Sequence, residues 1–134
     1  MTDSLTDRAS LRGLGPSASA ALRRGLAGSL YTPQDPGFAE ARRFHAGTGD
    51  PAAVARVVGP ADVATTLAVA RDEGLPVAVR VGGHSMWESV PGAVVIDLAE
   101  LRSVRVEGTR GRVGGGATWG EVADVLATHG LGIS

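Results

Sequence analysis

The sequence predicts an α+β fold in which helices pack on a mixed β-sheet, in the order β-α-β-β-β-β-α. Three observations lead to this prediction. A strand-length apolar run at 52–58 is separated from a second run at 75–81 by a segment with helical spacing. Three more strand-like segments follow without a helix between them, and an amphipathic helix comes last. The two strands joined through a helix are expected to be parallel.

The first part of the chain carries weaker signals. Residues 1–16 are expected to form a loose leader, and SASAALRRGLAG at 17–28 is typical of a short helix. The pieces YTPQDPGF and HAGTGDP are rich in proline and glycine, which favour turns, so this part is predicted to be mostly loop. We therefore expect a leader, a short helix and loops over 1–43, and one partial domain over 44–134.

A helix is predicted at 59–74, between the first two strands. Pro60 stands near its start and Asp62 in its first turn, where both residue types are favoured, and Gly74 is a typical end. The apolar face of this helix is expected to carry Val63, Leu67 and Ala70.

The last part of the chain predicts a hairpin and a helix. AVVIDL, SVRVEG and GRVGGG are typical of short strands, and EGTR is a plausible hairpin turn between the last two. In TWGEVADVLATHG, Thr118 and Glu121 predict a capping box, and Gly130 predicts the helix end. The buried stripe of this helix is expected to contain Val122, Val125 and Leu126.

Composition excludes several function classes. A chain of 134 residues fits one domain and not two. The formal net charge of −1 and the dispersed basic residues give no support for binding nucleic acid or an anionic membrane. All 13 basic side chains are arginines, which excludes P-loop lysine and Schiff-base chemistry. The absence of cysteine excludes disulfides, thiolate nucleophiles and zinc–thiolate sites.

No stretch approaches the roughly 18 apolar residues that a membrane span requires. Arg23 and Arg24 are not followed by an apolar segment long enough for an export signal. We therefore expect a cytoplasmic protein.

The motif VGGHS follows directly after a predicted strand. Gly82 and Gly83 lack a Cβ where the backbone must turn, so consecutive N–H groups can point into one concavity and hold an anion such as a pyrophosphate. The alternative is a simple tight turn that leaves His84 as a surface side chain.

The other candidate residues point to structural roles. VGGGATWG does not fit the dinucleotide pattern G-x-G-x-x-G, because Trp119 would occupy the third glycine position; a strand-to-helix connection packed by Trp119 is the alternative. His45 and His129 lack carboxylate partners at ligand spacing, and Asp97 is expected to be a turn or cap acceptor. The sequence thus predicts no catalytic residue and no metal site.

Four motifs in register resemble one known family. They are PAAVARVVGPADV, ARDEGLPVAVRVGGHS, GAVVIDL and VGGGATWGEV. Together they resemble the N-terminal part of the FAD-binding domain of berberine bridge enzyme-like oxidases, within the vanillyl-alcohol oxidase and para-cresol methylhydroxylase superfamily. The resemblance runs from about Phe44 to the last residue and implies a partial flavin-binding domain of that type, with FAD as cofactor.

The resemblance also implies roles for individual residues. The loop that wraps the FAD pyrophosphate would consist of Arg80, Val81, Gly82, Gly83, His84 and Ser85. The histidine at position 84 would be bonded through a ring nitrogen to the 8α-methyl carbon of the flavin, and a neutral imidazole offers the nucleophilic nitrogen that this bond needs. Covalent attachment would prevent loss of the cofactor.

The sequence differs from the family pattern at several points, and these differences limit which family properties can apply to this chain. The second flavin bond of some members needs a cysteine, so double attachment is excluded within this chain. The rest of the flavin domain and the substrate domain, which provides the catalytic base in the family, are expected to lie outside these residues. His45 stands where the family often has asparagine.

Three hypotheses follow. The chain is the FAD-binding portion of an FAD-dependent oxidoreductase that transfers hydride from a small organic substrate to flavin and returns the electrons to oxygen. Alternatively, it is a truncated fragment that holds no flavin and has no activity. In the third hypothesis it is an interaction module, or one half of a split flavoprotein, that pairs with another chain through an unfinished sheet edge.

Overall fold

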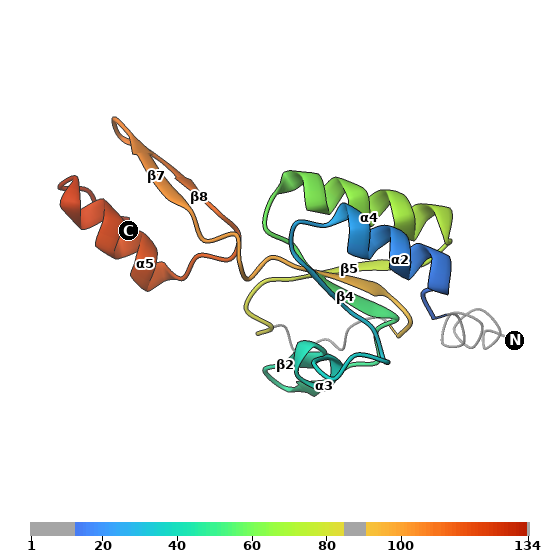
Figure 1. The fold of residues 1–134 in the computed structure, drawn as a ribbon. Helices are drawn as coiled ribbons and strands as arrows, with labels where there is room; N and C mark the ends of the chain where they lie inside the picture. The colour runs from blue at the N-terminus through green and yellow to red at the C-terminus, as the bar shows by residue number, and fades with distance from the viewer. Residues whose placement is uncertain (1–12, 85–90, 134) are drawn as a thin grey trace, which may run out of the picture.

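The computed structural model describes residues 13–84 and 91–133 (Figure 1). Its main sheet has four strands in the order β1-β4-β6-β5. β4 (Ala53–Arg56), β6 (Val94–Asp97) and β5 (Val77–Arg80) are parallel, and β1 (Ser29–Tyr31) pairs antiparallel with β4. The predicted mixed sheet, with its helix-linked strands parallel, is confirmed.

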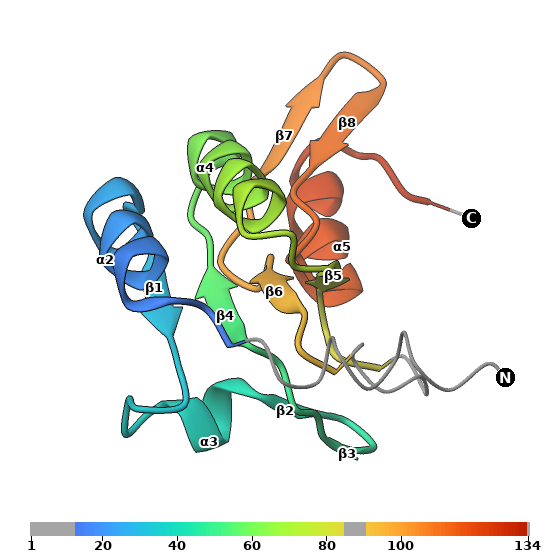
Figure 2. The same ribbon diagram turned by 90° about the vertical axis from the view of Figure 1, so that its right-hand side faces the viewer.

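The central strands β4 and β6 consist mainly of continuous apolar runs, in which polar and apolar residues do not alternate. All four residues of β6 and the first three of β4 are buried, as expected for parallel strands covered on both faces. Figures 1 and 2 show α2 (Pro16–Gly25) and α4 (Pro60–Asp72) side by side over one face of the sheet, and α3 (Phe38–Ala41) on the other face. The core under α2 and α4 consists of Leu22, Leu30, Ala53, Ala55, Val57 and Ile96.

Helix α4 faces the sheet with part of the predicted side, because Ala70 is buried and Val63 packs against the core. Leu67 is 46% exposed, so its assignment to the buried face was wrong, whereas Asp62 and Thr66 are buried. The contacts of Asp62 explain this difference. Its carboxylate accepts hydrogen bonds from the backbone N–H groups of Ala27, Gly28 and Val58 at 2.9–3.0 Å. These contacts hold Asp62 on the side of the helix that faces the sheet. Thr66 and Ala70, four and eight positions later, lie on the same side.

The segment between α2 and β4 contains more regular structure than the predicted loop. Besides β1 and α3 it contains a small antiparallel pair, β2 (Arg43–Phe44) and β3 (Gly47–Thr48). Strands of two or three residues show no periodicity in a sequence, and each forms here only because a partner strand lies beside it. His45 lies in the turn between β2 and β3.

The last elements form a separate layer beside the sheet (Figure 1). β7 (Val104–Glu107) and β8 (Arg110–Val113) form the predicted hairpin, whose turn includes Gly108 at φ +61°. The hairpin packs against α5 (Trp119–Thr128). The capping box of α5 is confirmed: Thr118 Oγ1 accepts from the Glu121 N–H at 3.3 Å, and Glu121 Oε2 accepts from the Thr118 N–H at 2.8 Å. In its stripe Val122 and Leu126 are buried and Val125 is partly buried.

The glycine cluster at 114–116 connects the two layers. A Cβ on Gly114 would overlap the carbonyl oxygen of Leu101, and one on Gly116 would overlap that of Leu98. The cluster is therefore a close backbone contact. Trp119 is 74% exposed, so the prediction that it packs this connection was wrong.

Among the helices of residues 13–84 and 91–133, none has the length and apolar character to cross a membrane. The cytoplasmic location stays a prediction.

Candidate functional site

The predicted site loop lies where the parallel strands end. Strand β5 ends at Arg80, and the loop continues from its carboxyl end, which is the edge at which open parallel sheets bind ligands. The structure describes the following residues of the predicted site: Arg80, Val81, Gly82, Gly83 and His84. Ser85 lies outside the described residues.

A buried carboxylate holds the ends of the three parallel strands together. Asp97 stands in register with Arg56 on one side and Arg80 on the other. Its Oδ2 lies 3.1 Å from Arg56 Nε and 2.7 Å from Arg80 Nη2, and its Oδ1 accepts from the Ala99 N–H at 3.1 Å. The predicted role of Asp97 as a turn acceptor is thus confirmed. The two ion pairs were not predicted.

The ionisation of Asp97 follows from these contacts. Burial raises the pKa of Asp97, but the hydrogen bonds from Arg80 and Ala99, with the charge of Arg80 and the contact to Arg56, outweigh burial and hold it below its ordinary value. Asp97 is therefore a carboxylate that organises the strand ends, and its lone pairs are already engaged.

Arg80 links the sheet to the segment that contains β2. While Nη2 contacts Asp97, Nη1 donates to the carbonyl oxygens of Ala41 and Arg43 at 2.6 and 2.8 Å. Both terminal nitrogens of Arg80 are thus engaged within the protein. Its contribution at this site is to position residues 41–45.

The positioned segment contacts the site loop directly. The His45 N–H donates to the Gly83 carbonyl at 2.7 Å. Gly83 has φ +68°, and a Cβ there would lie 3.3 Å from Phe44 Cα, so this position requires glycine for both conformation and space. At Gly83, the absence of a side chain therefore allows the backbone of Phe44 and His45 to lie close to the loop.

Two imidazole rings meet at this contact. The ring centroids of His45 and His84 are 4.8 Å apart, with the planes tilted by 35°. A Cβ on Gly82 would lie 2.8 Å from His84 Cδ2, so the missing side chain leaves room for the His84 ring. From the sequence, His45 was predicted to be structural and was not linked to His84. No spacing signal could have linked it to His84, because the contact depends on the Arg80 bridge.

The loop has the chemistry of an anion site. Within residues 13–84 and 91–133, the backbone N–H groups of Gly82, Gly83 and His84 donate to no backbone acceptor. Neighbouring N–H groups around a glycine with positive φ form a concavity suited to phosphate oxygens. His84 is exposed beside them. These residues fit a diphosphate ligand with an electrophilic carbon near the imidazole.

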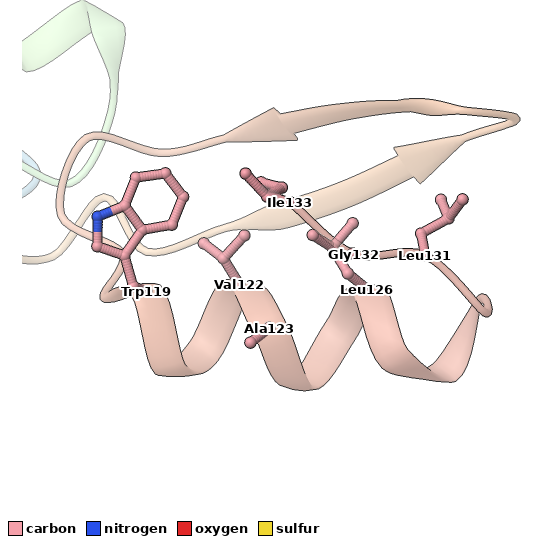
Figure 3. A pocket seen from close by; sticks show the side chains of 7 residues that line it. All are labelled: Trp119, Val122, Ala123, Leu126, Leu131, Gly132 and Ile133. Atoms are coloured by element: carbon pink, nitrogen blue, oxygen red, sulfur yellow. The ribbon is translucent and has the colours of Figure 1, made fainter.

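A second concave feature lies on the other layer. Figure 3 shows Trp119, Val122 and Leu126 on one face of α5, with Ile133 opposite them. The groove has a volume of about 570 Å³, and it is lined by Trp119, Val122, Ala123, Leu126, Leu131, Gly132 and Ile133. Apart from the indole N–H of Trp119, the side chains that line it are apolar, so it has no charged group for a charged ligand. Sequence reasoning did not identify this groove.

Related proteins place the chain among flavoproteins. (R)-6-Hydroxynicotine oxidase of Paenarthrobacter nicotinovorans is 32% identical over 112 residues, which are 79% of this chain and 24% of that protein. An FAD-dependent monooxygenase of Cochliobolus heterostrophus is 40% identical over 83 residues, or 56% of this chain and 15% of that protein. The chain thus spans about a quarter or less of the length of these relatives.

Solved structures agree with this assignment. 6-Hydroxy-D-nicotine oxidase from Arthrobacter nicotinovorans superposes with a TM-score of 0.71 at 31% identity, covering 78% of this chain and 24% of that chain. A chitooligosaccharide oxidase gives a TM-score of 0.74 at 21% identity, with 85% and 26% covered. A variant of the berberine bridge enzyme-like protein 1 of Physcomitrella patens gives 0.72 at 20%, with 84% and 26% covered. The last two likenesses concern the fold alone.

A family model described as the FAD binding domain matches residues 51–134, which is more than half of the chain. The family resemblance drawn from the sequence motifs is confirmed, and so is FAD as the cofactor of this domain. The chain belongs to the FAD binding domain family.

Proposed function

We propose that this chain is the FAD-binding portion of an FAD-dependent oxidoreductase of the oxidase type. Residues 80–85 hold the FAD pyrophosphate, and His84 is bonded to the flavin. The observation that carries this proposal is the exposed imidazole of His84, which directly follows a glycine pair at the carboxyl edge of the parallel strands. When bound, FAD supplies the acceptor for a hydride from a small organic substrate.

Each part of the loop has its own task in this proposal. The backbone N–H groups of Gly82 and Gly83 bind phosphate oxygens, and the side chain of Arg80 keeps the strand end in place through Asp97. A ring nitrogen of His84 would be the protein atom that is bonded to the flavin, and its N–H proton would be lost on attachment. The bound FAD would supply two-electron redox chemistry.

For the substrate, only a broad chemical class is proposed. The relatives are named as an oxidase of (R)-6-hydroxynicotine and an FAD-dependent monooxygenase, and the chain covers about a quarter or less of each. We therefore propose hydride transfer from a small organic substrate, with the electrons passed to oxygen, and assign no catalytic base to this chain.

The test is the intact mass of the denatured chain after expression with excess FAD, together with its visible absorption. We expect a mass increase of one FAD that is lost in His84→Ala and kept in His129→Ala, a control at the exposed end of α5. Covalent flavin in His84→Ala overturns the attachment site. Colourless, unmodified wild-type protein supports the alternative that these residues alone form a fragment without flavin.

A second candidate function is favoured by the apolar groove on α5. Trp119 and Ile133 line it and are 74% and 63% exposed, which is unusual for large apolar side chains on one face. In this candidate the chain is one part of a flavoprotein whose remaining part, in the same or another chain, covers the groove. Tryptophan fluorescence of a Trp87→Phe variant, which keeps Trp119, tests it. Addition of the remaining part should shift the emission of Trp119 to shorter wavelength, and Val122→Glu should prevent the shift.

A further inference from the structure

The contact between His45 and His84 carries one inference beyond the binding of FAD. We propose that His45 is a positioning residue for His84, holding the imidazole of His84 in one orientation through its ring and fixing the loop through its backbone. The proposal rests on the function proposed above, because it concerns the same attachment site.

The backbone contribution is a short chain of hydrogen bonds. Arg80 is held by Asp97 at 2.7 Å and in turn holds the carbonyl oxygens of Ala41 and Arg43. The pairing of β2 with β3 then forms the turn that presents His45. The His45 N–H reaches the Gly83 carbonyl at 2.7 Å. The loop before His84 is therefore fixed by a segment that is itself anchored on a buried carboxylate.

The ring contribution is a tilted stack. With centroids 4.8 Å apart and planes at 35°, the two imidazoles are within the range of favourable aromatic contacts. His84 is exposed, so without a neighbour its ring samples several rotamers. The ring of His45 removes part of this freedom, while His84 as a whole remains exposed. A nucleophile that is oriented before its partner arrives reacts faster.

Two substitutions separate the ring from the backbone. His45→Ala and His45→Phe both keep the N–H that binds Gly83, but only His45→Phe keeps a planar ring beside His84. If the ring positions His84, His45→Phe behaves like the wild type and His45→Ala does not. Circular dichroism and thermal unfolding of both variants check that the fold is retained.

The first measurement needs no cofactor. In NMR spectra of the flavin-free chain we expect nuclear Overhauser effects between the ring protons of His45 and His84. The His84 ring resonances should move toward random-coil positions in His45→Ala and stay displaced in His45→Phe. Identical His84 ring resonances in the wild type and His45→Ala overturn the proposal.

The second measurement follows covalent incorporation by mass at several FAD concentrations. We expect His45→Ala to lower the maximal rate of attachment about tenfold at an unchanged half-saturating FAD concentration. His45→Phe should restore the rate. Equal rates in the wild type and His45→Ala overturn the proposal. If the wild type attaches no flavin while the NMR contacts are present, the proposed function fails and the positioning of His84 by His45 stands.

Discussion

Arg80 and Asp97 lie opposite each other on neighbouring parallel strands, and Arg80 Nη2 donates to Asp97 Oδ2 at 2.7 Å. Their side chains are 16% and 2% exposed, so the pair is largely withdrawn from water. Arg56 approaches the same oxygen from the other neighbouring strand at 3.1 Å. One carboxylate thus pairs with two guanidinium groups at the edge that leads into the candidate flavin loop, so the cluster keeps one net positive charge.

Replacing Asp97 by asparagine should strongly destabilise the fold. Asp97→Asn leaves two guanidinium groups facing a neutral amide in a partly buried place, and the expected loss is about 3 kcal/mol in the free energy of unfolding. Urea denaturation measures this loss. Asp72→Asn is the control, because the Arg71–Asp72 pair is well exposed and should contribute less than about 0.5 kcal/mol. Equal losses in the two variants would contradict a structural role for Asp97.

The stability of the protein should fall in acid, with Asp62 as one source. Burial raises the pKa of Asp62, but the backbone N–H groups of Val58, Ala27 and Gly28 outweigh it and hold the pKa below its ordinary value. In acid the unfolded chain therefore binds more protons than the folded one. The contribution of Asp62 is complete above its unfolded-state pKa of about 3.9 and is lost as the pH falls toward the folded-state value.

Urea unfolding between about pH 7 and about pH 3 checks this sign. In Asp62→Asn the free energy of unfolding should be lower at neutral pH and should decline less in acid. A steeper decline in the variant than in the wild type would contradict the assignment of Asp62 as a source of the acid sensitivity. Asp35, whose pKa is lowered to about 2, mainly by hydrogen bonds from Thr32, acts in the same direction in both proteins.

Gly83 should tolerate a side chain less well than another glycine of similar conformation. Gly83→Ala and Gly108→Ala both place alanine at a φ of +68° or +61°, so both incur a conformational cost of about 1 kcal/mol. Only at Gly83 does the new Cβ also contact Phe44 Cα, at 3.3 Å, whereas at Gly108 it meets open space. We expect a larger loss of thermal stability for Gly83→Ala, and Gly83→Val to be worse. Equal melting temperatures for the two alanine variants would argue against the close contact.

Features that depend on neighbouring residues could be predicted from the sequence. The capping box of Thr118 and Glu121 is complete within four residues, and the hairpin turn needs only the residues around Gly108. The apolar runs of β4 and β6 also predicted their burial, because such runs are stable only when both faces are covered.

Features that depend on distant contacts were missed. Leu67 is exposed because Asp62 finds its hydrogen-bond donors near β1 and β4, which the helical pattern does not encode. The stack of His45 on His84 requires the Arg80 bridge between two segments far apart in sequence. The family resemblance predicted the cofactor loop, but this neighbour of its histidine became visible only in the folded chain.

Gly114 and Gly116 bring main chain directly against the carbonyls of Leu101 and Leu98 where the hairpin layer follows the sheet layer. Any side chain at either glycine would force these main-chain segments apart, so the joint between the layers depends on two positions that cannot vary in size. Chimeras that exchange the hairpin and α5 between relatives should therefore assemble only when both glycines are kept.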